Sequence, residues 1–220
     1  MLSLILLANP YNNAHAAETI DIGTLKNTEI KVVQKILYTK KGKTEYGAHL
    51  GVMPFDAYTI TPKIDLTYGQ HLSEELMWEG GLGLGYGLKN STFSELEGPS
   101  YGITPDAYRY LSSIHASAQY SPIYAKMTWD GSNILHHDIY ALGGATLAVE
   151  QAFMADEEIS IAPGVSIGLG ARVFLPSGGV IRIQLRDDIL FQGRPKTAAV
   201  QGFYIKQNAT LSVGYTLLRK

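Results

Sequence analysis

A strict alternation of apolar residues with small or polar ones constrains this chain more than any other feature. It is clearest from Ile159 to Leu175, where the apolar set is Ile159, Ile161, Val165, Ile167, Leu169, Ala171, Val173 and Leu175. The positions between them hold Ser160, Ala162, Gly164, Ser166, Gly168, Gly170, Arg172 and Phe174. Only a β-strand places alternate residues on two opposite faces. The stretch therefore predicts a strand with one apolar face.

The same alternation recurs along the chain. Leu82, Leu84, Tyr86 and Leu88 alternate with glycines, and Ala209, Leu211, Val213, Tyr215 and Leu217 alternate with Thr210, Ser212, Gly214 and Thr216. Weaker patterns predict five further strands, at Thr44 to Met53, Ala57 to Gly69, Ile114 to Met127, Leu135 to Val149 and Val180 to Leu190. The total is about eight, and each is near the length that crosses a membrane.

The faces of these strands indicate a membrane barrel. A soluble barrel turns its larger apolar residues inward, whereas a transmembrane barrel turns them outward to lipid. Here Leu, Ile, Val and Tyr alternate with glycine, serine and charged residues, which favours the outward arrangement. With 45% hydrophobic and 17% charged residues, the chain is also too apolar for disorder. We predict an all-β, single antiparallel up-and-down transmembrane β-barrel of about eight strands, in the bacterial outer membrane.

Connection lengths support this topology. Outer-membrane barrels have short periplasmic turns and longer extracellular loops. The predicted short turns are Gln70 to Ser73, Thr128 to Ile134 and Pro176 to Gly179, and the predicted long loops are Lys89 to Ser113, Glu150 to Glu158 and Phe191 to Gly202. The tight hairpin at Pro54-Phe55-Asp56 is the exception. Thr104-Pro105-Asp106 predicts a short helix over Thr104 to Ser113 inside the first long loop.

The N-terminal residues suggest export. Met1 to Leu7 is apolar, and Ala14-His15-Ala16 has the small-x-small pattern of a cleavage site, although no basic residue precedes the apolar run. We predict a signal peptide over residues 1–16, a periplasmic N-terminal segment over 17–43 and the outer-membrane barrel domain over 44–220. A disordered or packed N-terminal segment is the alternative. The chain has no cysteine and therefore no disulfide to form after export.

Charged residues fall on the strand faces that we assign to the interior. An eight-stranded barrel is filled by side chains, so buried charges inside it must pair. The sequence predicts a network that stabilises a plugged lumen, formed by Glu45, Asp65, Glu75, Glu79, Arg172, Arg182 and Arg186.

Motifs for chemistry are absent. His136 and Asp138 share a strand face while His137 points away, which leaves too few ligands for a metal site. Ser117 and His115 share a face, yet no Gly-x-Ser-x-Gly motif supports a hydrolase. The glycines at 81–87 lack the Lys-Ser/Thr of a phosphate loop. We predict no catalytic residue, no cofactor site and no metal site. The net charge of −2 also argues against nucleic acid.

Short motifs carry a family resemblance. They are Val33-Gln34-Lys35 followed by Tyr38, Lys43-Thr44-Glu45, Leu72-Ser73-Glu74-Glu75, Asp138-Ile139-Tyr140 with Gly143, and Leu185-Arg186-Asp187-Asp188. In these the chain resembles the outer-membrane β-barrel domain family typified by myxobacteria and related gliding or predatory bacteria. The resemblance implies an eight-stranded outer-membrane barrel, in a family with some members linked to gliding motility or envelope complexes. Asp188 and the Arg219-Lys220 end depart from the aromatic residues expected there.

These observations favour a non-enzymatic barrel with a structural or envelope-interaction role. The expected partners are outer-membrane lipid, the barrel-insertion machinery and envelope proteins that bind the loops at 89–113 and 191–202. A small-solute pore, a lipid-active barrel enzyme and a soluble barrel for an apolar ligand remain as alternatives. The strand count argues against the pore, because a lumen of eight strands is filled by side chains.

Overall fold

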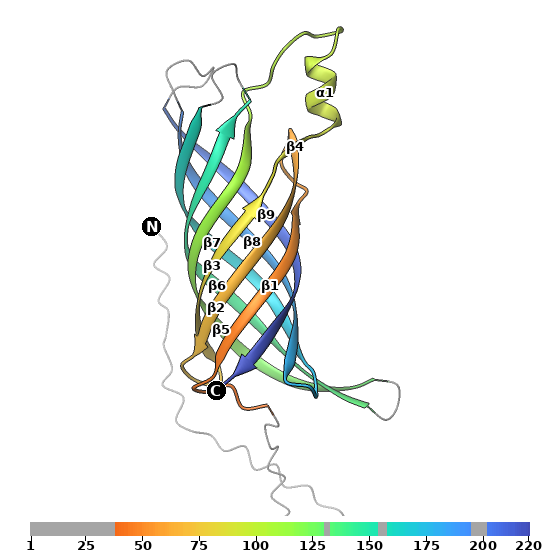
Figure 1. Ribbon diagram of the computed structural model, residues 1–220, viewed down its shortest axis with the longest axis vertical. Coiled ribbons are helices and arrows are strands. Elements are labelled where there is room, and N and C mark those ends of the chain that lie inside the picture. The colour runs from red at the N-terminus through yellow and green to blue at the C-terminus, as the bar shows by residue number, and fades with distance from the viewer. Residues whose placement is uncertain (1–37, 130–132, 154–157, 195–201) are drawn as a thin grey trace, which may run out of the picture. The chain divides into compact units, whose positions relative to one another are not determined.

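A computed structural model describes residues 38–129, 133–153, 158–194 and 202–220 of the chain. Eight long strands form its wall (Figure 1). They are β1 (Thr44–Met53), β2 (Thr59–His71), β3 (Leu76–Gly85), β5 (Tyr108–Trp129), β6 (Asn133–Ala152), β7 (Ile159–Phe174), β8 (Gly179–Arg194) and β9 (Gly202–Arg219). Two small elements, β4 (Leu88–Lys89) and helix α1 (Ser91–Glu97), follow β3. The predicted signal peptide, residues 1–16, and residues 17–37 of the predicted periplasmic segment over 17–43 lie outside the described residues.

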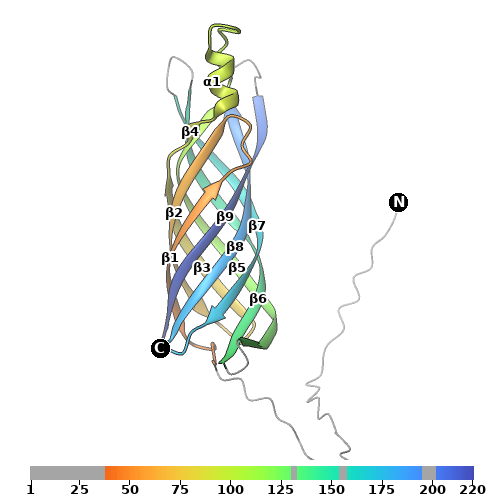
Figure 2. The same ribbon diagram turned by 90° about the vertical axis from the view of Figure 1, so that its right-hand side faces the viewer.

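The eight strands close into a ring. Each long strand pairs antiparallel with its neighbour, and the ring is completed where β1 pairs with β9 from Thr44–Arg219 to Val52–Leu211. β1 also pairs with β2, so β1 lies between β2 and β9 in the ring. Closure gives both edges of β1 a partner, which removes the exposed edges of an open sheet. The predicted fold class is confirmed, and Figure 2 shows the tilted strands from a second side.

The wall has an apolar outer face and a polar inner face. Leu50, Ile114 and Ile161 are 68%, 63% and 62% exposed on the outside. Arg172 and Arg182, which alternate with outward residues on β7 and β8, are 0% exposed. Water cannot stabilise such an outer face, but hydrocarbon can, so the alternation read from the sequence is that of a lipid-facing barrel.

Aromatic side chains mark two levels on the outer face. Near one end, the ring centroids of Tyr46 and Tyr68 are 5.2 Å apart and those of Tyr68 and Trp78 are 5.6 Å apart, with Tyr215 on the neighbouring strand β9. We call this group the lower aromatic belt. Near the other end, Tyr86 and Phe191 also face outward. Such belts flank the hydrocarbon layer in membrane barrels.

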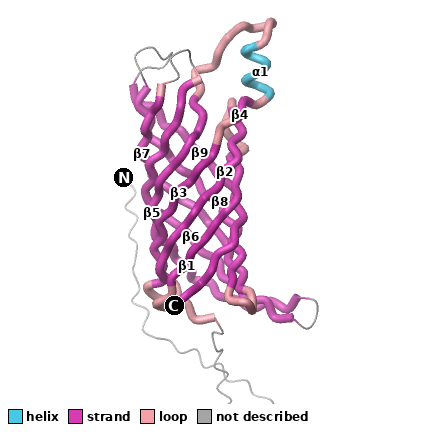
Figure 3. Tube along the Cα trace, viewed as in Figure 1, coloured by secondary structure: helices cyan, strands magenta, loops and turns pink. Residues whose placement is uncertain are grey.

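The two ends of the barrel differ in their connections. The strand end at Thr44 and the C-terminal strand end at Arg219 pair at one end, which also holds the turns after His71 and Phe174. The second turn needs Gly178, whose φ of +83° favours glycine. The longer connections lie at the opposite end (Figure 3). Because short turns are periplasmic in outer-membrane barrels, we call the first end periplasmic and the second extracellular.

The helix lies elsewhere than the sequence predicts. Residues 104–113 do not form a helix, since β5 begins at Tyr108 and its first residues pair with β6, with a bulge between Tyr110 and Ser112. The helix is α1, where the Asn90 side chain accepts a hydrogen bond from the Phe93 amide at 2.9 Å. Asn is a strong N-cap, and pairing across the sheet outweighs the weaker Thr-Pro signal. No helix among the described residues is long and apolar enough to span a bilayer.

Candidate functional site: a filled lumen and an extracellular vestibule

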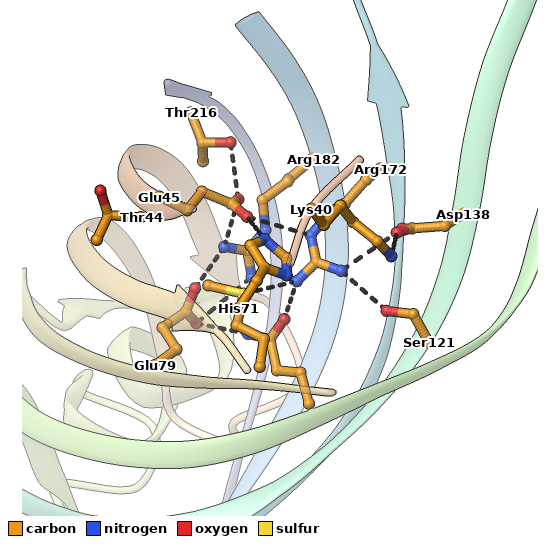
Figure 4. A network of polar contacts seen from close by, with 12 residues as sticks. Lys40, Thr44, Glu45, His71, Glu79, Ser121, Asp138, Arg172, Arg182 and Thr216 are labelled. Carbon is orange, nitrogen blue, oxygen red and sulfur yellow. Dashed lines mark hydrogen bonds and ion pairs between the residues drawn. The ribbon is translucent and has the colours of Figure 1, made fainter. Parts of the chain in front are cut away.

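Two arginines on neighbouring strands form the centre of the lumen near its periplasmic end. Arg172 on β7 and Arg182 on β8 are directly opposite each other in the strand register. Like charges at opposite positions repel, so the pair requires nearby carboxylates. Figure 4 shows these carboxylates around the two guanidinium groups.

Arg182 is neutralised by carboxylates from two other strands. Its Nη1 forms ion pairs with Glu79 and, at 3.3 Å, with Glu45 Oε1. Glu45 is fixed from the other side by the Thr216 hydroxyl, which donates a hydrogen bond at 2.8 Å, and by His71 Nε2 at 3.0 Å. Strands β1, β2, β3, β8 and β9 therefore all contribute to one contact group.

Arg172 is surrounded in the same way. Its Nη1 is 3.5 Å from Asp138 Oδ1 and donates to Ser121 at 3.1 Å, while Nη2 donates to Gln119. The ring of Tyr140 lies 4.2 Å from the Arg172 guanidinium carbon, a distance at which the ring face attracts a cation.

Lys40 completes this layer from outside the strands. The backbone N–H of Lys40 donates to Glu74 at 2.8 Å, and its side chain enters the lumen, where Nζ contacts Asp138 at 2.6 Å. Nearby, the Tyr38 ring stacks on Phe174 with centroids 5.5 Å apart. The layer thus has three cations, Lys40, Arg172 and Arg182, and three carboxylates, Glu45, Glu79 and Asp138. We call these six residues the lower layer.

A second set of charges fills the middle of the lumen. Lys63 pairs with Asp65 at 3.1 Å, and Arg186 pairs with Asp188 at 2.8 Å. A cavity of about 10 Å³ remains beside them, lined in part by His49. A cavity of this size holds about one water molecule at most, so this part of the lumen is packed rather than open.

A third group closes the lumen near the extracellular end. Glu150 is 0% exposed and accepts hydrogen bonds from Gln192 at 2.8 Å, Lys206 at 2.8 Å and Asn208 at 3.1 Å. Lys206 also donates to the Tyr108 carbonyl at 3.0 Å. The five residues of this group, which we call the Glu150 group, come from β5, β6, β8 and β9, so the group ties together opposite parts of the wall.

Above this third group lies a hollow that we call the vestibule. Its volume is about 530 Å³, which is within the range of small-ligand pockets. Its lining includes Phe55, Asp56, Tyr58, Tyr108, Tyr204 and Lys206. Tyr58 therefore faces the vestibule rather than an aromatic belt.

The predicted lumen residues separate into two layers and one outlier. Glu45, Glu79, Arg172 and Arg182 meet in the lower layer. Asp65 and Arg186 lie in the middle, and their ion-pair partners are Lys63 and Asp188 rather than each other. Glu75 lies outside the network, because β3 begins one residue later and Glu75 is exposed in the turn before it.

Sequence reasoning left out several residues of the network. Asp138 and Glu150 both occupy inward-facing positions of β6. The alternation along this strand is therefore enough to place them in the lumen. Lys40 has no such signal, because it precedes β1 and reaches the lumen through a turn at Gly42, whose φ is +75°. Only the folded chain brings Lys40 next to Asp138.

The residues considered for catalysis do not form a reactive group. His115 and Ser117 share the inner face as predicted, and they are only 4% and 7% exposed. His115 Nδ1 and Ser117 Oγ have no hydrogen-bond partner among the described residues, so nothing activates the hydroxyl. Among those residues, no group of three or more His, Cys, Asp or Glu is placed to hold a metal ion.

No protein-family model and no curated protein sequence matches the chain. Among solved structures, the chain is similar to the N-terminal β-barrel domain of Pseudomonas aeruginosa OprF, with 12% identity, a TM-score of 0.48 and coverage of 80% of this chain and 98% of that chain. Neisserial surface protein A (14%, 0.42, 80% and 95%) and Ail of Yersinia pestis (12%, 0.41, 81% and 99%) are also similar.

These similarities are too low for a function to be transferred, and the class of this protein follows from its own strand pairing. The ring has eight antiparallel strands, its outer face is apolar between aromatic residues at both ends, and its short turns share one end. Each of these is a property of outer-membrane barrels. The protein is thus an integral β-barrel of the bacterial outer membrane.

Proposed function

We propose that this protein is a non-enzymatic, plugged barrel that acts through its surfaces, in a structural or envelope-interaction role. The observation that carries the proposal is the filled lumen. The lower layer, the middle charges and the Glu150 group follow each other along the interior, and each is made of buried, mutually paired side chains. A solute that entered would have to displace these pairs, which is costly in a low-dielectric interior.

The extracellular end supports an interaction role. There the loop after β3 is folded: Phe93 of α1 is 0% exposed and its ring centroid is 4.7 Å from that of Phe153. Lys89 lies over the Phe93 ring at 4.5 Å, and it also pairs with Glu97 at 2.7 Å. A preorganised loop loses less conformational entropy when it binds. Together with the vestibule, it offers a shaped surface for an envelope component.

The proposed partners are membrane lipid at the outer wall, the barrel-insertion machinery during assembly, and envelope proteins at loops 89–113 and 191–202. Residues 195–201 of the second loop lie outside the described chain. A place in a motility or envelope complex remains part of this proposal. A lipid-active enzyme is disfavoured, because Ser117 and His115 are enclosed in the lumen, where a lipid in the surrounding membrane cannot reach them.

Planar-bilayer recording tests the plugged lumen. We expect no stable ion-conducting steps from the folded protein, because the three charged groups block the lumen. A double Arg172→Ala and Arg182→Ala variant, checked for folding, should also stay closed, because the middle charges and the Glu150 group still fill the lumen. Stable conductance of the unaltered protein would contradict the proposal and favour the small-solute pore.

Site-specific photo-crosslinking in whole cells tests the interaction role. A photoreactive side chain at Tyr101, which is 58% exposed in the extracellular loop, should give adducts of defined mass with an envelope component. The control position is Leu50, which faces lipid on β1. Adducts of defined mass at Leu50 and none at Tyr101 would place the interaction on the wall instead.

A further inference from the structure

A single carboxylate faces outward on the wall of β8. Asp187 lies between Arg186 and Asp188, which point into the lumen, so its own side chain points away from the lumen. In the register it is opposite Ile167 of β7 and Ala209 of β9. Its Oδ1 is covered by the surrounding wall, and that atom has no hydrogen-bond partner among the described residues.

The position of Asp187 along β8 is at the depth of the hydrocarbon layer. It is six residues above Ile181, which pairs with Tyr215 at the level of the lower aromatic belt, and four residues below Phe191. With a rise of about 3.3 Å per residue and a strand tilt of about 40°, these spacings are roughly 15 Å and 10 Å along the barrel axis. The apolar band of such barrels is about 25 Å tall, so Asp187 lies inside it.

No other described outward-facing residue between the two aromatic levels is charged. Ionisable groups in a membrane are costly and are found paired or in a functional site. The described residues of this chain give Asp187 no such partner, and lipid headgroups are roughly 10 Å away along the barrel axis. A partner for Asp187 must therefore lie in the plane of the membrane.

The surrounding surface has the composition of a packing face. Gln207 of β9 also points outward, since it is opposite outward-facing Ile189, two positions from Asp187. It supplies an amide donor beside the carboxylate acceptor. Ala209 lies between them and is the smallest side chain there, so another wall can approach closely. The flanking residues Leu185 and Leu211 are 50% and 47% exposed and supply apolar contact.

We propose that the outer face of β8 and β9 around Ala209 binds a second copy of this chain. A two-fold interface uses the same surface on both copies, so a contact from residue i to residue j occurs twice. One face that contains both an acceptor and a donor fits this arrangement. Asp187 of each copy accepts a hydrogen bond from the Gln207 amide of the other, and the two Ala209 residues lie near the axis.

The natural absence of cysteine makes this proposal directly testable. Ala209→Cys introduces one thiol at the proposed axis, and Ala116→Cys introduces one on the outward face of β5 as a matched control. Under mild oxidation in native membranes, we expect Ala209→Cys to form a disulfide-linked dimer at least tenfold faster than Ala116→Cys. Equal rates at the two positions would overturn the proposal.

Substitutions at Asp187 and Gln207 distinguish a dimer formed through the proposed contact from a disulfide formed by random collision in the membrane. In the Ala209→Cys background, Asp187→Leu should reduce the dimer to the level of the Ala116→Cys control, while Asp187→Asn should retain it because an amide oxygen still accepts from Gln207. Faster migration without boiling verifies that each variant has folded. If Asp187→Leu fails to fold, Gln207→Leu tests the same pair. Undiminished dimer in a folded variant, or a disulfide to a chain of another mass, would overturn the second-copy assignment.

Discussion

Charged residues of the same type differ in whether they join the lumen network, and their side-chain chemistry alone does not show which of them do. Glu75 and Glu79 are four residues apart and identical in type, yet Glu79 is 2% exposed and bonded to Arg182, whereas Glu75 is exposed in a turn. The sequence predicts both as lumen residues, because alternation assigns a face but not the residue at which a strand begins. Most of the predicted charges therefore occupy the lumen, and the outlier is at a strand boundary.

Arg182→Met should destabilise the folded barrel strongly. The substitution leaves Glu79 buried without its cation and removes one of the two guanidinium groups that pair with Glu45. Removing one partner of a buried ion pair typically costs about 3–5 kcal/mol. We expect the folded, unboiled form to be lost at a clearly lower temperature in a heating series followed by electrophoresis. Glu75→Gln is the matched control and should leave the heat resistance unchanged. Full heat resistance of Arg182→Met would show that the lower layer is dispensable.

Among the elements, the residues from Tyr38 to Lys43 act as a periplasmic closure for the lumen. Tyr38 stacks on Phe174 of β7, and Lys40 reaches Asp138 of β6, so a segment before the first strand contacts distant strands. The strands themselves could be predicted from the sequence because their alternation is local. This closure could not, because it depends on a turn at Gly42 and on contacts that form only in the closed ring.

Lys40→Ala should weaken the barrel at this end. Asp138, which is 0% exposed, would lose its 2.6 Å contact and retain only the longer ion pair with Arg172. An unsatisfied buried acceptor typically costs about 1–3 kcal/mol. The urea midpoint of the protein in detergent should fall accordingly. Lys41→Ala, which removes an exposed side chain while keeping the backbone contact to Glu74, should not shift that midpoint; a similar fall in both variants would argue against a specific role for Lys40.

At the scale of the whole molecule, stability depends on the closed ring. Eight strands follow from the sequence, because period-two alternation and turn residues specify them, and the small and charged residues between the large apolar ones indicate which face is inward. The closing pairs between β1 and β9 are far apart in sequence, and no local pattern specifies their register. Physical closure is what separates a barrel from a sheet with two exposed edges.

Removal of residues 211–220 should abolish the heat-dependent shift in electrophoretic mobility. The full chain is expected to migrate faster unboiled than boiled, because a closed barrel remains compact in detergent. The truncated chain lacks the part of β9 that pairs with β1, so the ring cannot close. A double Arg219→Ala and Lys220→Ala variant changes only the end of this strand and should keep the shift. A shift that persists after truncation would mean that closure occurs elsewhere.

The opposed arginines of β7 and β8 also affect the order of assembly. Arg172 and Arg182 come together as soon as the β7–β8 hairpin forms, but their carboxylates are on β1, β3 and β6. A hairpin formed alone therefore contains a repulsive pair, and Glu45 arrives only with the first strand of the chain. Partly assembled sheets are penalised and the complete ring is favoured. The lumen charges thus favour cooperative insertion, since Arg182 meets both of its carboxylates, Glu79 and Glu45, only when β3 and β1 have joined the same ring as β8.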